Sequence, residues 1–275
     1  MSDDNKQKRS DIFSILCVGD VVARRGREFL KEQCAFLRNQ HQVDLFIANA
    51  ENASGGTGLE PSSAKELQSA GVDVMTLGDH AWKWREVRGF LDNNSELCIR
   101  PANFPPGAPG QGWTVWTSAG GVKVGIMNLL GRTFINANLD CPFRKADELL
   151  AGPLSDCDIV VCDCHAEATS EKFALAHYLD GKISLLFGTH THVATADSQV
   201  LPKGTGYITD LGMCGCTEGV LGMDSTVAIE RFVTGLPRGY KAAKGACKLN
   251  GIIASIERST GKALKVERVE VQSSD

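Results

Sequence analysis

Polar side chains of the types that bind metals follow five apolar segments of the sequence. Each segment is hydrophobic and then gives way to an acidic, amide or histidine residue. If these segments are parallel strands of an open α/β sheet, their carboxyl ends meet at one edge and bring the polar residues together. Four of the six histidines stand at such ends, together with three carboxylates. The candidate ligands are Asp20, Glu51, Asn52, Asp79, His165, His190 and His192.

The mixture of these residue types indicates a class of metal site. Carboxylates and imidazoles without thiolates suit iron, manganese or zinc in catalytic centres. Seven ligands exceed the needs of one ion but suit two ions about 3.5–4 Å apart that share a carboxylate and a hydroxide. If residues 190–192 are extended, His190 and His192 point to the same side. The same alternation turns Cys162 and Cys164 away from His165, although a zinc site remains an alternative, built from Cys162, Cys164, His165, Cys214 and Cys216.

The first half of the chain alternates short apolar runs with amphipathic stretches. This alternation predicts βαβ crossovers and a largely parallel sheet. We expect strands at Phe13–Val18, Val43–Ala50 and Val72–Leu77, and helices at about Gly26–Gln40, after Pro61 and at about Arg85–Asp92.

The second half begins with a Pro/Gly-rich loop, residues 103–112, and becomes richer in strands. A hairpin is expected there, then one more helix, and then mainly strands. The expected helix is about Ser170–Leu179, and the expected strands are Trp113–Thr117, Val122–Leu130, Asp158–Asp163, Ile183–Phe187, Val200–Leu201, Gly206–Thr209, Ser225–Phe232, Leu249–Glu257 and Ala263–Val271. We predict an α/β fold of two packed sheets with helices outside, formed by a single domain (residues 12–275) after a polar N-terminal tail (residues 1–11).

Composition excludes several classes of protein. The 275 residues carry 33 acidic and 29 basic side chains, for a net charge of −4, and no long basic run is present. A broad surface for duplex nucleic acid is therefore not expected. No apolar stretch approaches the roughly 18 residues of a membrane span, and the polar start is unlike a signal peptide. Ten cysteines without a C-x-x-C pattern indicate free thiols and a cytoplasmic location.

Several sequence blocks resemble a known enzyme family. They are AENASGGTG (Ala50–Gly58), RPANFP (Arg100–Pro105), CHAEATSEK (Cys164–Lys172), GTHTHV (Gly188–Val193) and TDLGMCG (Thr209–Gly215). In this order they resemble the calcineurin-like metallophosphoesterases, and within these the bacterial YmdB-like branch, from about Ile15 to Val271. The resemblance implies a two-sheet αββα sandwich. It also implies hydrolysis of phosphodiesters, 2′,3′-cyclic nucleotides among them, at a pair of iron or manganese ions, with zinc or magnesium as alternatives.

The resemblance also assigns roles to the candidate ligands. It implies that one metal is held by Asp20, Glu51, Asn52 and His192, and the other by Glu51, His165, His190 and Asp79, with Glu51 as the bridge. Two residues depart from the family pattern: Asp79 replaces an asparagine, and Lys83 stands where an acidic residue is expected. An extra anionic ligand should hold metal more tightly but raise the pKa of bound water. We therefore expect Asp79 to shift metal preference or to slow turnover.

A mechanism follows from these assignments. A hydroxide between the two metals would attack the phosphoryl group, and His80, next to Asp79, would protonate the leaving oxygen. The alternative for His80 is that it only orients a ligand. Arg100 and Asn103 are candidate substrate contacts, since the planar guanidinium suits oxyanions, although a loop arginine can also be merely solvated.

Two other functions remain open at this point. One is a phosphomonoesterase, and the other is a regulatory protein that binds metal and nucleotide with little turnover, for which Asp79 and Lys83 are the hint. The expected partner is a small phosphodiester or a short RNA, without a membrane. A homo-oligomer also remains open.

Overall fold

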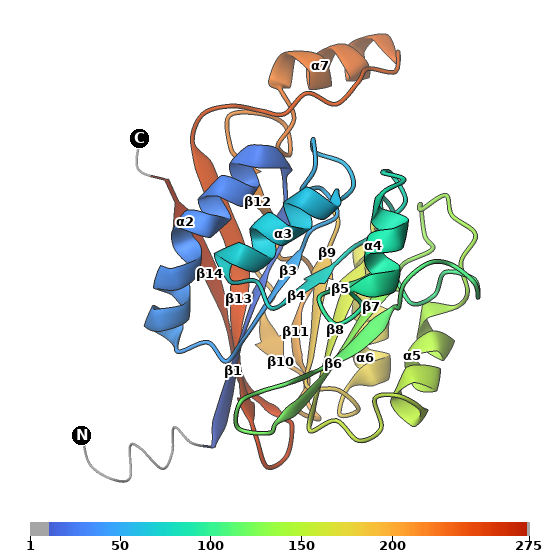
Figure 1. Ribbon diagram of the computed structural model, residues 1–275, viewed down its shortest axis with the longest axis vertical. Coiled ribbons are helices and arrows are strands. Elements are labelled where there is room, and N and C mark those ends of the chain that lie inside the picture. Colours follow the sequence, from blue (N-terminus) through green and yellow to red (C-terminus); the bar gives the residue numbers. More distant parts are fainter. Residues whose placement is uncertain (1–10, 274–275) are drawn as a thin grey trace.

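The computed structural model describes residues 11–273, which contain two β-sheets and six helices (Figure 1). The predicted tail, residues 1–11, therefore lies outside the described residues except for Asp11. The first sheet has the order β2-β12-β13-β1-β3-β4-β5, and β14 pairs with β13. Its strands are β1 (Ile12–Val18), β2 (Asp20–Val21), β3 (Leu45–Asn49), β4 (Val74–Thr76), β5 (Cys98–Ile99), β12 (Met213–Cys216), β13 (Cys247–Glu257) and β14 (Ala263–Gln272).

The second sheet has the order β10-β11-β9-β8-β7-β6. Its strands are β6 (Trp113–Thr117), β7 (Lys123–Leu130), β8 (Ile159–His165), β9 (Leu185–Thr189), β10 (Gln199–Val200) and β11 (Gly206–Ile208). The pairs of β1, β3, β4 and β5 are parallel, and so are those of β7, β8, β9 and β11. The parallel pairing predicted for the first half of the chain is confirmed, and so is the hairpin of β6 and β7.

Apolar side chains fill three layers of core, because strands alternate the faces to which their residues point. The core between the sheets contains Ile15 and Ile47 from the first sheet and Val161 from the second. A second core lies outside the first sheet, under α2 (Ala23–His41), α3 (Pro61–Ala70) and α4 (Val87–Asn93). The third lies outside the second sheet, under α5 (Pro142–Ala151) and α6 (Thr169–Leu179). Helices therefore cover both outer faces, as predicted.

One predicted strand is wrong. Residues 225–232 belong to helix α7 (Ser225–Thr234), which lies beyond the ends of the strands (Figure 1). The Asp224 side chain caps its start by accepting hydrogen bonds from the backbone N–H groups of Thr226 and Val227, and Gly235 ends it at φ 68°. Its β-branched and aromatic residues are typical of a strand, but Phe232 and Val233 are exposed rather than buried.

The helix α5 was not predicted. It begins with Pro142 at its first turn, and buried Ala146 and Leu149 lie on one side of it. The other predicted helices and strands are present with bounds that differ by a few residues. Among residues 11–273, no helix is both long and apolar enough to cross a membrane.

Candidate metal centre

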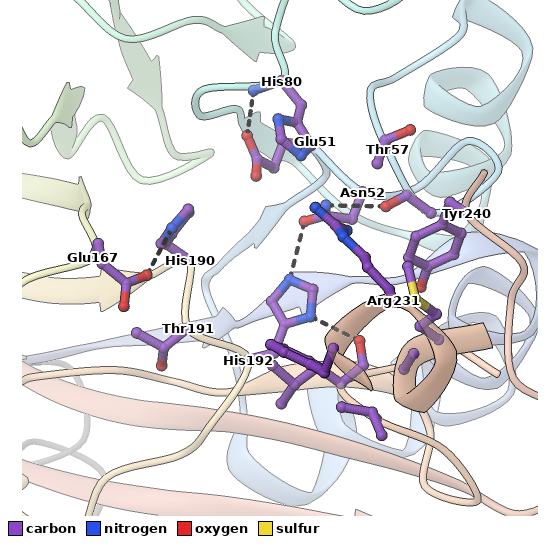
Figure 2. Close-up of a pocket in the computed structure, with 16 residues that line it drawn as sticks. Glu51, Asn52, Thr57, His80, Glu167, His190, Thr191, His192, Arg231 and Tyr240 are labelled. Atoms are coloured by element: carbon purple, nitrogen blue, oxygen red, sulfur yellow. Dashed lines mark hydrogen bonds and ion pairs between the residues drawn. The ribbon is translucent and has the colours of Figure 1, made fainter. Parts of the chain in front are cut away.

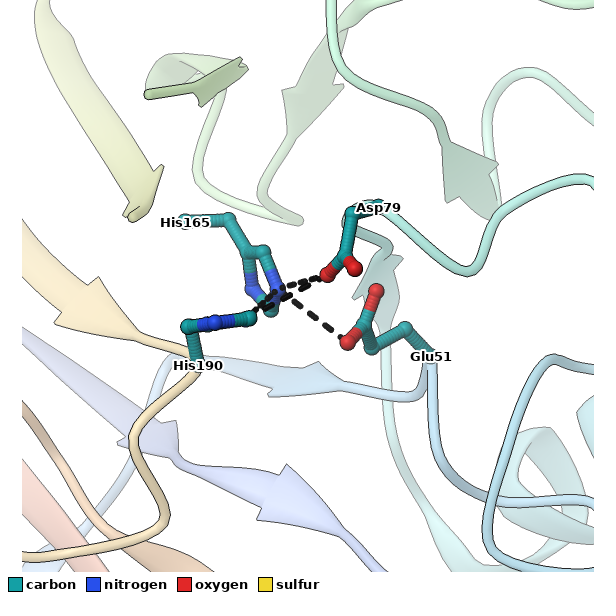
Figure 3. A group of neighbouring side chains, drawn as sticks. All are labelled: Glu51, Asp79, His165 and His190. Atoms are coloured by element: carbon teal, nitrogen blue, oxygen red, sulfur yellow. Dashed lines mark hydrogen bonds and ion pairs between the residues drawn. The ribbon is translucent and has the colours of Figure 1, made fainter. Parts of the chain in front are cut away.

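The polar residues that follow the parallel strands meet at one edge of the two sheets. Glu51 and Asp79 follow strands β3 and β4 of the first sheet, whereas His165 ends β8 and His190 follows β9 of the second. One ligand atom from each of these four residues lies within 4.8 Å of every other (Figure 3). The structure thus brings together residues that are far apart in the sequence.

His165 lies at the centre of this cluster and is fully buried. Its Nε2 atom is 3.1 Å from Glu51 Oε1, 3.2 Å from Asp79 Oδ1 and 3.0 Å from His190 Nδ1. Its other nitrogen, Nδ1, is 2.8 Å from Thr189 Oγ1, and that hydroxyl donates to Asp163 Oδ1 at 2.7 Å. Because the Thr189 proton is used in this way, Nδ1 is the donor to Thr189, which leaves Nε2 as the nitrogen that can bind a metal.

Asp163 lies behind His165 and is completely buried. Besides the Thr189 hydroxyl, it accepts a hydrogen bond from Asn49 Nδ2 at 3.0 Å. Burial raises the pKa of this carboxyl to about 6, whereas the nearby charge of His165 and the hydrogen bonds that Asp163 accepts favour its ionised form. Asn49 also accepts from the backbone N–H of Glu51 at 3.1 Å, so one buried amide orients both sides of the cluster.

In this cluster, burial and the neighbouring charges shift the pKa values of the side chains in opposite directions. Burial alone would raise the pKa of Glu51 and of Asp79, but the neighbouring histidines hold both pKa values below the usual carboxyl range. Conversely, burial would lower the pKa of His165, but Glu51 and Asp79 raise it. A proton on His165 thus balances the carboxylates, and a cation could replace this proton.

A second group of acceptors lies beside the first. His192 Nε2 is 3.3 Å from Asn52 Oδ1 and 3.7 Å from Asp20 Oδ1, and this Asp20 oxygen is buried with no hydrogen-bond partner in the described part of the chain. His192 Nδ1 is 3.1 Å from the carbonyl oxygen of Leu221 and donates to it, so that Nε2 is the nitrogen that faces Asn52 and Asp20. Asn52 Nδ2 donates to the Gly56 carbonyl, which turns Oδ1 toward His192.

These acceptors fit a bound metal ion. His192 Nε2, the amide oxygen of Asn52 and the unpartnered Oδ1 atom of Asp20 lie together, and a buried carboxylate oxygen without a partner is unfavourable unless a cation lies there. The other oxygen of Asp20 accepts from the backbone N–H of His190 at 3.0 Å and so connects the two groups. Oxygen and nitrogen donors of this kind suit iron, manganese or zinc.

The backbone of the turn at residues 190–192 differs from the prediction. His190 and His192 have φ values of 102° and 63°, so this segment is not extended. Both rings still face the site, because the turn itself redirects them. By contrast, the predicted alternation in β8 is confirmed: Cys162 and Cys164 pack in the outer core, on the side opposite to His165.

A buried ion pair holds this turn. Lys172 of α6 is fully buried, and its ammonium donates to Asp210 Oδ2 at 2.7 Å and to the Thr189 carbonyl at 2.8 Å. Asp210 Oδ2 also accepts from the backbone N–H of Thr191 at 3.2 Å. We call this arrangement the Lys172–Asp210 clamp. Sequence reasoning missed both residues, although they lie in two of the family-like blocks.

Asp197 supports the same loop from the other side. It accepts hydrogen bonds from the hydroxyls of Thr195 and Thr209 and from the backbone N–H of Thr209. Burial would raise the pKa of Asp197, but these hydrogen bonds lower it below its ordinary value.

The two predicted substrate contacts lie elsewhere. Arg100 is buried in the Pro/Gly-rich loop, where its guanidinium donates to the carbonyl oxygens of Pro101, Ala108 and Pro109. Asn103 is also buried; its amide binds backbone groups of Leu130 and Asp140. These bonds hold the loop together, and neither residue lines the cavity beside the metal cluster.

The alternative zinc site does not form. Cys214 and Cys216 belong to the core outside the first sheet, whereas Cys162 and Cys164 belong to the core outside the second. All ten cysteines are free, and the clustered ligand set is the one of carboxylates and histidines.

His80 lies at the rim of the cluster. Its Nδ1 atom is 3.1 Å from Asp79 Oδ2, and its backbone N–H donates to Glu51 Oε2 at 3.0 Å. The hydrogen bond with Asp79 raises the pKa of His80. Lys83 lines a neighbouring hollow of about 230 Å³ with Asp79 and His80, but it forms no ion pair with Asp79 among the contacts of residues 11–273.

A cavity of about 470 Å³ opens over these residues (Figure 2). Its inner side is formed by Glu51, Asn52, His80, His190 and His192. Its outer side is formed by the segment that carries α7. A ligand in this cavity would therefore touch both the metal residues and α7.

The two-sheet fold and the cluster of carboxylates and histidines together indicate a metal-binding hydrolase. The chain belongs to the family described as "YmdB-like protein", whose model matches residues 16–269. It is 46% identical over 255 residues to the 2′,3′-cyclic-nucleotide 2′-phosphodiesterase of Bacillus subtilis (strain 168), with 93% of this chain and 96% of that protein covered.

Two solved structures are similar over nearly the whole chain. One is a hypothetical protein from Thermus thermophilus, with 40% identity and a TM-score of 0.89 over 95% of this chain and 100% of that one. The other is described as a novel phosphatase from Mycoplasma pneumoniae, with 35% identity and a TM-score of 0.89 over 95% of this chain and 94% of that one.

Proposed function

We propose that the protein is a metal-dependent phosphodiesterase that opens 2′,3′-cyclic nucleotides by hydrolysis of the 2′ ester, which leaves a nucleoside 3′-monophosphate. The observation that carries this proposal is the convergence of Glu51, Asp79, His165 and His190, whose ligand atoms lie within 4.8 Å of one another. The substrate class is supported by the B. subtilis relative, which is named for it. The layered fold supports an assignment to the calcineurin-like sandwich type.

We assign two metal ions to the site, iron or manganese by preference, with zinc or magnesium as alternatives. Asp20, Asn52 and His192 would hold one, and Asp79, His165 and His190 the other, while Glu51 would be shared. Such ions, when bound, would lower the pKa of a water molecule and neutralise negative charge on the phosphoryl oxygens. The site residues hold this geometry without the substrate, because Asn49, Asp163 and Thr189 orient the ligands from behind.

His80 is the proton donor in this proposal. Its Nδ1 atom is held by Asp79, and its ring lines the cavity with more than a third of the side chain exposed. The Asp79 carboxylate favours the imidazolium form, which can give a proton to the departing 2′ oxygen from Nε2. Asp79 thereby serves both the metal cluster and the donor.

The proposal is tested by a substrate screen on the purified protein loaded separately with iron, manganese, zinc and magnesium. The substrates are a 2′,3′-cyclic nucleotide, bis(p-nitrophenyl) phosphate and p-nitrophenyl phosphate, and products are separated by chromatography. We expect the cyclic nucleotide to be hydrolysed and the monoester to be a poor substrate. Preferential hydrolysis of the monoester would make the protein a phosphomonoesterase, a class that the M. pneumoniae neighbour's description favours.

The role of His80 is tested with His80→Ala. We expect kcat for the cyclic nucleotide to fall about 10²–10⁴-fold, with a much smaller loss for p-nitrophenyl esters, whose leaving group needs no protonation. His177→Ala, at an exposed histidine of α6, is the matched control. Metal content is measured on the same samples. Loss of metal, or an equal loss on both kinds of ester, would show that His80 only orients the ligands.

We also propose a cytoplasmic location, supported by the ten free thiols. Cys216 and Cys247 lie with their sulfur atoms 3.4 Å apart and are not bonded. Mass spectrometry with a thiol-specific label, applied to freshly lysed cells, would test this. Labelling of the denatured protein at all ten cysteines is expected.

A further inference from the structure

The outer side of the cavity is built by one excursion of the chain, residues 217–246, between β12 and β13. Its two ends are joined by a hydrogen bond from the backbone N–H of Thr217 to the Ala246 carbonyl, at 2.9 Å. A tight turn at Leu221 and Gly222 follows, closed by two backbone hydrogen bonds between Val220 and Met223. We call the cavity-lining part of this excursion the outer wall; it consists of Val220, Leu221, Met223, Ala228, Arg231, Phe232 and Tyr240.

The outer wall contacts the opposite side of the cavity at two points, His192 and Gly56. The carbonyl of Leu221 accepts the hydrogen bond from His192 Nδ1. The Tyr240 ring packs directly on Gly56, so closely that a Cβ atom at residue 56 would lie 1.8 Å from the ring. The wall therefore has a defined position relative to the residues that would hold the metal ions.

Arg231 is the charged residue of this wall and has no partner of its own. Its guanidinium forms no hydrogen bond or ion pair with any residue that the structure describes, whereas Arg238 on the same excursion pairs with Glu230. Figure 2 shows Arg231 extending from α7 into the cavity toward Asn52. A free guanidinium beside a metal cluster is suited to an oxyanion, because its planar N–H groups match two oxygens at once.

The rest of the outer wall is apolar. Phe232 lines the cavity and is 84% exposed, so its ring has an uncovered face, and Leu221 and Met223 lie in the same lining. The inner side of the cavity is made of His80 and the proposed metal ligands, so the two sides differ sharply in chemistry. A ligand that complements both sides of the cavity has an anionic end for the metal residues and a flat apolar end for the Phe232 ring. The cavity of about 470 Å³ is of the size that holds a single small-molecule ligand.

We propose that the outer wall is the nucleoside subsite, where Phe232 stacks on the base and Arg231 binds oxygens of the phosphoryl group held at the metal cluster. This inference rests on the proposed function and deepens it, because it assigns the residues that would bind the nucleoside part of the substrate. Phe232 would contact the π-face of the base, which every base has. The outer wall would therefore bind nucleotides more tightly than simple phosphates, without distinguishing among the bases.

The experiment measures binding rather than turnover. Isothermal titration calorimetry on the manganese-loaded protein gives Kd for adenosine 3′-monophosphate and for inorganic phosphate. Phe232→Ala should weaken the nucleotide about tenfold, the lower end of the range for loss of one base stack, and leave phosphate unchanged. Arg231→Gln should weaken both ligands about tenfold.

Two exposed neighbours provide matched controls. Val233 follows Phe232 on α7 and is 78% exposed, but does not line the cavity; Arg238 is engaged with Glu230. Val233→Ala and Arg238→Gln should each leave both Kd values within twofold of the wild type. In kinetics with a 2′,3′-cyclic nucleotide, Phe232→Ala should raise KM by a larger factor than it lowers kcat.

Several results would overturn the inference. One is equal binding of nucleotide and phosphate by the wild type, and another is identical behaviour of Phe232→Ala and Val233→Ala. A change of oligomeric mass in Phe232→Ala, measured by light scattering, would assign the side chain to a contact between two copies of the chain. If the nucleotide binds as expected but no phosphodiester is hydrolysed with any metal, the proposed function fails and the subsite stands.

Discussion

Replacing Lys172 with methionine should destabilise the protein and loosen the metal centre at the same time. The Lys172 side chain is fully buried and its two partners, Asp210 and the Thr189 carbonyl, are buried as well. Methionine has a similar volume and no charge, so the substitution removes the ammonium without opening a large cavity. Asp210 is then left as a buried carboxylate without its cation.

The magnitude follows from this burial. Removing one partner of a buried ion pair typically costs about 3–5 kcal/mol, because the remaining charge is desolvated and unpaired. At about 3 °C per kcal/mol for a protein of this size, Tm should fall by about 10 °C. The control is Lys182→Met, since Lys182 pairs with Asp147 at 3.2 Å and both side chains are nearly half exposed. That change should cost less than about 1 kcal/mol.

The assay is thermal and urea unfolding of metal-free protein, both followed by circular dichroism, together with metal analysis after reconstitution. Because Asp210 also accepts from the Thr191 backbone N–H, the loss of Lys172 should displace the His190–His192 turn and lower bound metal. Adding Asp210→Asn to Lys172→Met should recover part of the lost stability by removing the unpaired charge. A Lys172→Met protein within about 1 kcal/mol of the wild type, with full metal content, would refute the clamp.

Three further outcomes are expected. Asp79→Asn removes one of three anionic ligands, and so should lower metal content and change the rates with iron, manganese and zinc; unchanged content and rates would contradict the role given to Asp79. Gly56→Ala should weaken binding of adenosine 3′-monophosphate because its Cβ would displace Tyr240, whereas Gly55→Ala, also at a positive φ but with open space around it, should not; equal calorimetric effects would argue against a fixed wall. Asp197→Asn should lower the free energy of unfolding by about 1 kcal/mol at pH 7. Because folding lowers the pKa of Asp197, this difference is present above the unfolded pKa near 4 and should vanish as the pH falls through the folded value, as urea unfolding between pH 7 and pH 3 would show.

The meeting of the candidate ligands could be predicted because it depends on chain direction alone. Segments such as FSILCV and VDVMTL are short, apolar and followed by polar residues, so their pairing as parallel strands brings Asp20 and Asp79 to one edge. The two-sheet arrangement followed from the change in pattern after the Pro/Gly-rich loop. Both features follow from local sequence patterns, and tertiary contacts are not needed to predict them.

Other features depend on contacts that local sequence does not encode. Residues 225–232 are typical of a strand by composition, but the Asp224 cap at the start and Gly235 at the end favour a helix. Arg100 stands in a loop, where its guanidinium could not be assigned to backbone carbonyls before the loop was folded. The Lys172–Asp210 clamp joins residues 38 positions apart, so neither residue alone indicates it.

The residues proposed as metal ligands come from two sheets that share no hydrogen-bonded strand within residues 11–273. Asp20, Glu51, Asn52 and Asp79 belong to one half of the protein, and His165, His190 and His192 to the other. A cation held here would therefore join the two halves at the edge of the sheets where these strands end. When metal is scarce in a cell, the folded chain would then be degraded by proteases sooner, and it would also lose its activity.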